Sequence, residues 1–167
     1  MKSIFKSYFS ALVMLLVVSS CTTDNANIED NLSETELKIV SIEAKSIELE
    51  ILNLINKHRE SKGLNTLNNM PIIKSVAYSH TDYMADKDVV SHDNFFIRSN
   101  YLKSNIGAKQ VSENVAYGYT SAESVVNAWI RSEGHKANLE GDYTNFDISA
   151  EKSLDGNWYY TNIFIKK

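Results

Sequence analysis

The stretch FDISAEKSLDGNWYYTNIFI, residues 146–165, decides the fold class because it predicts a β-hairpin. Its first five residues alternate between apolar and polar, and its last part, Trp158–Ile165, is rich in aromatic and β-branched residues. Both patterns are typical of strands, and Asp155-Gly156 is a strong signal for the connecting turn. Lys109–Tyr117 is a further candidate strand. The end of the chain therefore predicts an antiparallel sheet.

Residues that precede the hairpin predict helices, because their apolar residues recur at steps of three and four. The first helix is expected from Ser33, which forms a capping-box pattern with Glu36, to the stop at Gly63. The second is expected to start near Pro71 and to bury one face; this face consists of Ile73, Val76, Ala77, His80 and Met84. A shorter helical piece is expected at about 95–105.

The helix with the clearest apolar stripe is expected to be capped by Thr120, with Glu123 three residues later, and to end at Gly134. The stripe is formed by Ala122, Val125, Val126, Trp129 and Ile130. Helices that precede a terminal hairpin predict an α+β fold in which helices pack on an antiparallel sheet.

The N-terminus predicts export from the cytoplasm. Lys2 and Lys6 are followed by the apolar run 11–18, which is too short to span a bilayer, and by Ser19-Ser20 before Cys21. The segment resembles a bacterial lipoprotein signal, which implies that residues 1–20 are removed and that Cys21 is acylated. Two alternatives are a plain signal peptide and an N-terminal membrane helix.

Composition excludes some classes of function. The chain has 17 Lys and Arg against 21 Asp and Glu, and removal of residues 1–20 takes away two lysines and no acid. Such an acidic chain is not expected to bind nucleic acid or to adhere electrostatically to anionic lipid. Cys21 is the single cysteine, so the fold is expected to need no disulfide.

The rest of the chain is divided into a tether and one domain. Residues 21–33 are polar and are expected to form a flexible tether that spans about 20 Å. Residues 34–167 are enough for a single domain with its own core.

Three residues stand out as chemical candidates. His92 lies in a polar loop, His135 follows an expected helix end, and Glu113 is an acid within an apolar strand. A carboxylate in such a strand needs partners or a raised pKa, so Glu113 is expected within hydrogen-bond reach of His92 or His135. Together the three would suit a zinc site with an open position or an acid/base set. A purely structural role is the alternative. A structural role is expected for His58, which lies near a helix C-terminus, and His80 is expected to be a hydrogen-bonded core histidine.

Several ordered motifs resemble bacterial CAP-domain proteins, of the superfamily of cysteine-rich secretory proteins, antigen 5 and plant pathogenesis-related proteins. The motifs are SHDNF (91–95), ENVA (113–116), WIRSEGHKANL (129–139) and WYYTNIF (158–164), with LINKHR (54–59) and the region 77–85 matching the first two helices of the family. The resemblance covers about residues 47–167. It implies an α-β-α sandwich with a small antiparallel sheet between helical layers and a concave cleft.

The resemblance also identifies the residues of the cleft. Many eukaryotic members line it with two histidines and two glutamates that can bind a divalent cation. His92 and Glu113 match one of each, whereas Ser132 and Tyr159 occupy the other two positions. His135 belongs to a motif of the bacterial subgroup. The resemblance therefore implies that any zinc bound by His92, Glu113 and His135 is held weakly and that no cofactor is assured.

The sequence leaves three functions open. The first is a membrane-tethered binding module of the bacterial cell envelope, outside the cytoplasm, whose cleft takes a small apolar or envelope-derived ligand. The second is a hydrolase, with or without a metal ion, that acts on peptide or cell-wall material. Asn114 and Asn138 either line the cleft or stabilise turns, and an interaction module with an incidental cleft is a third alternative.

Overall fold

The computed structural model describes residues 37–167, which form five helices and four strands. In chain order these elements are α1 (Ser46–Ser61), β1 (Asn68–Asn69), α2 (Pro71–Lys87), α3 (Phe95–Ile106), β2 (Gln110–Tyr117), α4 (Ala122–Arg131), α5 (Glu133–Leu139), β3 (Asn145–Lys152) and β4 (Trp158–Lys166). The predicted signal segment, Cys21 and the tether lie outside the described residues.

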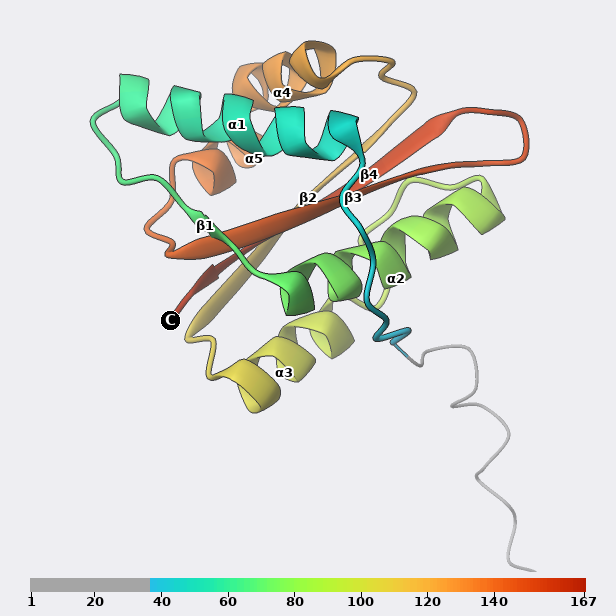
Figure 1. Ribbon diagram of the computed structural model, residues 1–167, viewed down its shortest axis with the longest axis horizontal. Helices are drawn as coiled ribbons and strands as arrows, with labels where there is room; N and C mark the ends of the chain where they lie inside the picture. The colour runs from blue at the N-terminus through green and yellow to red at the C-terminus, as the bar shows by residue number, and fades with distance from the viewer. Residues whose placement is uncertain (1–36) are drawn as a thin grey trace, which may run out of the picture. The chain divides into compact units, whose positions relative to one another are not determined.

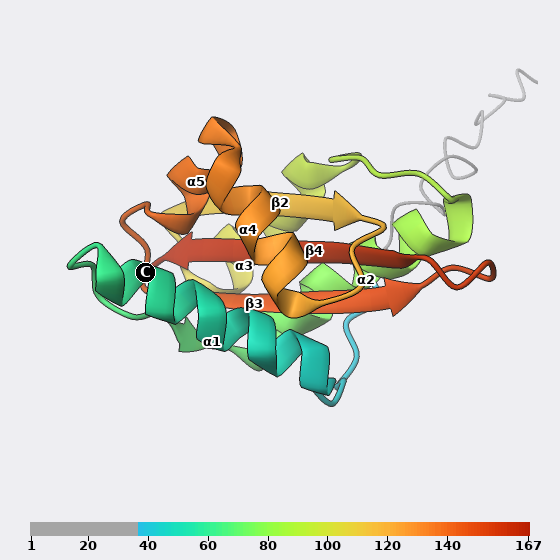
Figure 2. The ribbon, with the colours of Figure 1, turned by 90° about the horizontal axis from the view of Figure 1, so that it is seen from above.

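The sheet lies between two layers of helices, as Figures 1 and 2 show: α1, α4 and α5 cover one face, and α2 and α3 cover the other. The strand order is β1-β3-β4-β2. The predicted α+β sandwich is therefore confirmed. The sheet is mixed rather than wholly antiparallel, because β1 pairs in parallel with the start of β3. The hairpin β3-β4 and the pair β2-β4 are antiparallel.

Side chains of the central strand β4 alternate between the two helical layers, as the period of a strand requires. Tyr160 and Phe164 pack with Trp129 in one buried cluster, and Ile163 and Ile165 pack in another with residues of α2 and α3. The predicted buried face of α2 is confirmed, with Pro71 in its first turn. The hydrophobic cores on the two sides of the sheet thus fix on which face of the sheet each side chain of β4 lies.

The first helix begins later than predicted. Residues 37–45 are not helical, and α1 starts at Ser46. Two backbone N–H groups of the extended segment donate to serine hydroxyls on α2, from Lys38 to Ser79 at 3.1 Å and from Val40 to Ser75 at 2.7 Å. Because serines of α2 accept hydrogen bonds from these backbone groups, residues 37–45 stay non-helical although their apolar residues have helical spacing. The predicted cap at 33–36 lies outside the described residues.

The helix after β2 also differs from the prediction. Its N-cap is Ser121 rather than Thr120, and it ends at Arg131 because Ser132 adopts an extended conformation, with φ −95° and ψ 119°. Gly134 does not end a helix but lies within the next one, α5. His135 therefore projects from a helix and not from a turn.

The indole of Trp129 connects α4 to the sheet. It is buried, and its Nε1–H donates to the carbonyl of Val115 on β2 at 3.1 Å. This bond satisfies a donor that would otherwise be buried without a partner. It holds α4 against the strand that carries Glu113.

Candidate functional site

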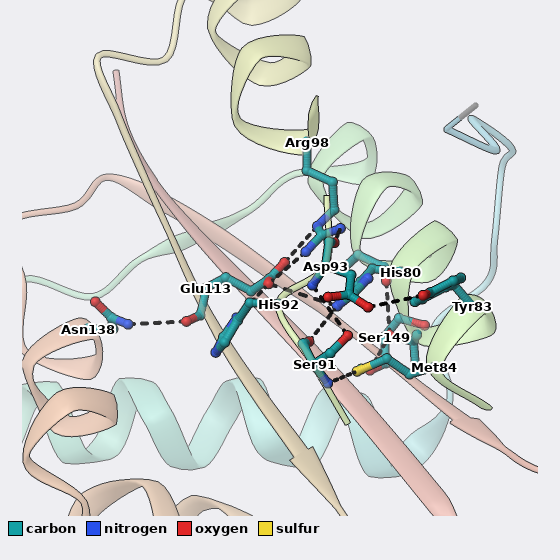
Figure 3. A network of polar contacts seen from close by, with 12 residues as sticks. His80, Tyr83, Met84, Ser91, His92, Asp93, Arg98, Glu113, Asn138 and Ser149 are labelled. Carbon is teal, nitrogen blue, oxygen red and sulfur yellow. Dashed lines mark hydrogen bonds and ion pairs between the residues drawn. The ribbon is translucent and has the colours of Figure 1, made fainter. Parts of the chain in front are cut away.

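Glu113 is the centre of a buried polar network that is drawn in Figure 3. Its side chain is 1% exposed and lies on the face of β2 that is covered by α2 and α3. Arg98 of α3 donates from Nε to Oε2 and from a terminal nitrogen to Oε1, both at 2.8 Å. Such a two-pronged contact is the strongest form of carboxylate pairing. The acid in the apolar strand thus has a full countercharge.

His92 binds the same carboxylate from the loop that joins α2 and α3. Its Nδ1 lies 2.8 Å from Glu113 Oε1, which confirms the predicted contact between the two residues. Burial alone would raise the pKa of Glu113, but the hydrogen bonds from His92 and Arg98 and the charge of Arg98 lower it below its usual value. Glu113 is therefore ionised at neutral pH.

The carboxylate fixes how the imidazole of His92 is presented. Because an ionised carboxylate can only accept, Nδ1 carries the hydrogen, and Nε2 is a hydrogen-bond acceptor whenever the ring carries no second proton. The His92 side chain is 52% exposed. Within residues 37–167 it has no other hydrogen-bond partner. One oriented imidazole nitrogen is thus available to solvent or to a ligand.

The loop that carries His92 is held by side chains of α2 and α3. His80 is buried, and its Nε2 donates to the carbonyl of Ser91 at 2.8 Å. Asp93 is bound at two points, by the Tyr83 hydroxyl at 3.1 Å and, through its carbonyl, by Arg98 at 2.7 Å. His80 is the hydrogen-bonded core histidine that was predicted. These contacts leave His92 little freedom of position.

His80 also lies close to the central carboxylate, with its Nε2 4.0 Å from Oε1 of Glu113. Burial and the charge of Arg98 lower the pKa of His80. His80 is therefore neutral at pH 7, which leaves Arg98 as the buried cation of the network.

Arg98 is the main partner that the sequence analysis missed. A signal was present: Arg98 and Leu102 share the buried face of α3, four residues apart. An arginine on such a face needs an acid within reach, and Glu113 is the acid that lies in an apolar strand.

On the other side of β2, two asparagine side chains connect the sheet to α5. Asn138 donates to the side-chain oxygen of Asn114 at 2.8 Å and to the carbonyl of Glu113 at 3.2 Å. Asn114 is fully buried and donates to the carbonyl of His135 at 3.1 Å. Because these amides bond within the protein, their observed role is to position α5 beside the site.

His135 and Ser132 form a second contact at the start of α5. The Nδ1 atom of His135 lies 2.9 Å from the hydroxyl oxygen of Ser132. Burial lowers the pKa of His135, and His92 lowers it further when it is protonated, so the His135 ring is neutral at pH 7. No direct hydrogen bond joins His135 to Glu113 among the described residues.

Tyr159 lies in a separate environment at the end of the sheet. It is buried in a cluster with Met84, Ala85 and Val115, and its ring contacts that of Tyr117 at a centroid distance of 4.8 Å. Burial raises the pKa of its hydroxyl. Its observed contacts are those of a core residue.

The donor set does not suit a metal ion. Within the described part of the chain, no three His, Cys, Asp or Glu side chains are placed to hold one. Both oxygens of Glu113 already bind the guanidinium of Arg98. A cation at this carboxylate would have to displace a buried positive charge.

Exposed apolar side chains occur in the segments that carry His92, Arg98 and Glu113. Val89 and Val90 belong to its loop, Phe96 lies in the first turn of α3, and Tyr117 ends the strand of Glu113. A shallow cavity of about 630 Å³ lies elsewhere, on the outer side of α3. Its lining consists of Leu37, Ile97, Asn100, Tyr101, Ser104 and Asn105.

Two proteins of Bacillus subtilis (strain 168) are related to the chain in sequence. The membrane protein YlbC is 32% identical over 124 residues, which are 72% of this chain and 34% of YlbC. The protein YkwD is 31% identical over 110 residues, which are 64% of this chain and 43% of YkwD. The chain therefore spans less than half the length of these relatives.

Solved structures share the fold. An outer surface protein of Borrelia burgdorferi aligns with a TM-score of 0.67 and 23% identity, over 75% of this chain and 96% of that chain. An extracellular protein of Bacillus anthracis that contains an SCP domain aligns with a TM-score of 0.62 and 26% identity, over 72% of this chain and 40% of that chain.

No helix in residues 37–167 is long and apolar enough to cross a membrane. The model of the family described as "CAP: Cysteine-rich secretory protein family" matches residues 52–164, which is more than half of the chain. The match includes His92, Glu113 and the region of α4 and α5. On this evidence, and in agreement with its sequence motifs, the chain belongs to the cysteine-rich secretory protein (CAP) family.

Proposed function

We propose that this protein is a binding module of the bacterial cell envelope, outside the cytoplasm, and that its ligand contacts His92. The observation that carries the proposal is the half-exposed imidazole whose Nδ1 is fixed by the buried Glu113–Arg98 pair. A buried ion pair of this kind is costly to build. At the surface, this ion pair orients one hydrogen-bonding group, the imidazole of His92.

The surroundings of His92 favour a small ligand with an apolar part. Binding sites are mostly apolar, with a few polar groups that fix orientation. The exposed side chains of Val89, Val90 and Phe96, which lie within about four residues of His92 in the sequence, would supply apolar contacts. The acceptor Nε2 of His92 would bind a hydroxyl or an amide N–H of the ligand, groups that are abundant in envelope material.

The place of action follows from the N-terminal sequence. The lipoprotein-like signal and the single Cys21 support a lipid anchor. Relatives carry consistent descriptions, since YlbC is described as a membrane protein and the Borrelia burgdorferi protein as an outer surface protein. We therefore propose that acyl chains on Cys21 tether the domain to a membrane.

A ligand-capture experiment tests the binding function. The full chain, purified in detergent, is incubated with an extract of bacterial envelope lipids and wall fragments, washed, and analysed by native mass spectrometry. We expect a retained small molecule in the wild type and its loss in His92→Ala. His58→Ala is the matched control, because His58 bonds Glu140 away from the site. Equal retention by all three proteins, or retention by none, would contradict the proposal.

The second candidate function is a hydrolase. It is favoured by the same imidazole, because a histidine whose Nδ1–H is held by a buried carboxylate presents Nε2 as a general base. Turnover of an ester, a peptide or a wall fragment by the wild type but not by His92→Ala would support this candidate. Retention of unchanged ligand would favour the binding module.

A further inference from the structure

Ser132 occupies the N-cap of α5 but does not act as a cap. The N-cap serine of a helix usually accepts from a backbone N–H of the first turn. Ser121 does this for α4, where it accepts from the N–H of Ser124 at 3.2 Å. Ser132 accepts no such bond. Its hydroxyl lies instead 2.9 Å from Nδ1 of His135.

The contact has the geometry of a nucleophile and its base, for which the usual separation is about 2.6–3.2 Å. Both side chains are half-buried and so remain accessible. Burial lowers the pKa of His135 and keeps its ring neutral at pH 7, so Nδ1 can accept the hydroxyl proton. The bond from Asn114 to the carbonyl of His135 holds the backbone of the base in place.

We propose that Ser132 is an acyl-accepting nucleophile and that His135 is its general base. The bond cleaved would be an ester or an amide of an acylated envelope component. The inference rests on the second candidate function, the hydrolase. It identifies the group that attacks and assigns the general base to His135 instead of His92.

The step conserves atoms and electrons. The Ser132 oxygen attacks the carbonyl carbon while its proton passes to Nδ1 of His135. The tetrahedral intermediate expels the alcohol or amine, which takes that proton, and leaves an ester on Ser132. Water then attacks this ester with His135 as base, a carboxylic acid is released, and the serine hydroxyl is restored. No redox partner is required.

The test uses the full chain in detergent with two probes. A fluorophosphonate reports the nucleophile as a covalent adduct that peptide mass spectrometry assigns to a residue, and p-nitrophenyl butyrate reports turnover. We expect an adduct on Ser132, none in Ser132→Ala, and labelling slowed by about 100-fold or more in His135→Asn, which is the usual contribution of a general base. Ser121→Ala is the matched control and should label like the wild type. Circular dichroism checks that each variant is folded.

The outcomes separate this inference from the hydrolase itself. Turnover that persists in folded Ser132→Ala would overturn the role of Ser132 and leave the hydrolase standing. Absence of both adduct and turnover in the folded wild type would overturn both. An adduct on another serine, or one whose rate is unchanged in His135→Asn, would also contradict the proposed pair.

Discussion

Two buried carboxylates, Glu48 and Glu113, are each paired with a buried cation, yet they differ in what else they bind. Glu48 binds Lys74 at 2.6 Å and also accepts from the backbone N–H groups of Lys45 at 2.6 Å and Ala150 at 2.8 Å. Glu113 binds Arg98, and the remaining hydrogen bond of its carboxylate is to the half-exposed His92. Lys45 Nζ, on a partly exposed side chain, lies 3.8 Å from Glu48 Oε1. The hydrogen bonds of Glu48 nevertheless form a network closed within the fold, whereas those of Glu113 hold a surface group. The comparison shows that burial of an ion pair does not by itself indicate a functional site.

The closed network has a structural task at the edge of the sheet. β1 covers only the start of β3, and beyond it Glu48 accepts from the N–H of Ala150 while Lys74 donates to the carbonyl of Ile148 at 3.2 Å. Side chains therefore occupy backbone groups that another strand could otherwise pair with. The Glu48 and Lys74 side chains thus bond backbone groups of β3 that a longer β1 would otherwise pair with.

The largest effect is expected from breaking the closed network. Glu48→Ala removes the carboxylate that directly pairs with buried Lys74, and breaking such a pair typically costs about 3–5 kcal/mol. Urea unfolding of the full chain measures the loss. The double variant Glu48→Leu/Lys74→Met should recover most of it, because no uncompensated charge remains. If the free energy of unfolding of the single variant fell by less than about 1 kcal/mol, the pair would not stabilise the edge of the sheet.

Arg98→Met should be next in size and should affect both stability and function. It leaves Glu113 buried without its guanidinium, and we expect a loss of about 3 kcal/mol at pH 7. Burial would then raise the pKa of Glu113, so the loss should shrink at acidic pH. Ligand retention should fall in parallel, because His92 loses its ionised partner. A variant that unfolds like the wild type at every pH would contradict the role of Arg98.

Asp147 should give an effect of opposite sign. The pKa of Asp147 is raised from 3.8 to about 6. Burial is the main cause and the charge of Glu48 adds to it, whereas hydrogen bonds from Ile148 and Met70 and the charge of Lys74 act in the opposite direction. An acid with a raised pKa in the folded state stabilises most below pH 3.8, and this contribution is lost as the pH rises through about 6.

The variant Asp147→Asn removes this penalty but also one hydrogen bond. We therefore expect a net gain of about 1–2 kcal/mol at pH 7 and no gain at pH 4. Urea titrations of wild type and variant at both pH values isolate Asp147 from His80 and His135, which are common to both proteins. A gain of equal size at the two pH values would show that titration of Asp147 is not the cause.

The smallest effect on stability is expected at the exposed end of the open network. His92→Ala removes one hydrogen bond from a half-exposed residue, which should cost about 1 kcal/mol or less. Thermal unfolding should change little, whereas ligand retention should be lost. If His92→Ala destabilised the chain as strongly as Glu48→Ala, the two networks would share one structural role.

Much of the fold could be predicted because its strongest signals are local. The period of α2 and the Asp155-Gly156 turn each follow from neighbouring residues. The start of α1 could not be predicted, because the N–H groups of Lys38 and Val40 bond serines that lie about forty residues away in sequence. The end of α4 was also predicted too late. The helix ends before Ser132, whose backbone is extended, and not at Gly134.

The candidate site was predictable only in part. The demand for a partner at Glu113 follows from an acid in an apolar strand, and His92 is one of its partners. Arg98 supplies two more bonds but lies fifteen residues away on another element, where no periodicity connects the two. The lack of a direct hydrogen bond between His135 and Glu113 in the described residues likewise depends on α5. The sequence analysis does not predict this helix, because Gly134 indicates the end of the preceding helix.

The bond between Trp129 and Val115 gives the protein an internal optical reporter. Trp129 is buried, while the second tryptophan, Trp158, is partly exposed, with Lys152 Nζ 4.8 Å from its ring centroid. The two indoles should therefore emit at different wavelengths, with the blue-shifted emission from Trp129. Because Val115 lies two residues from Glu113, separation of α4 from the strand that supports His92 should appear as a red shift of that emission alone.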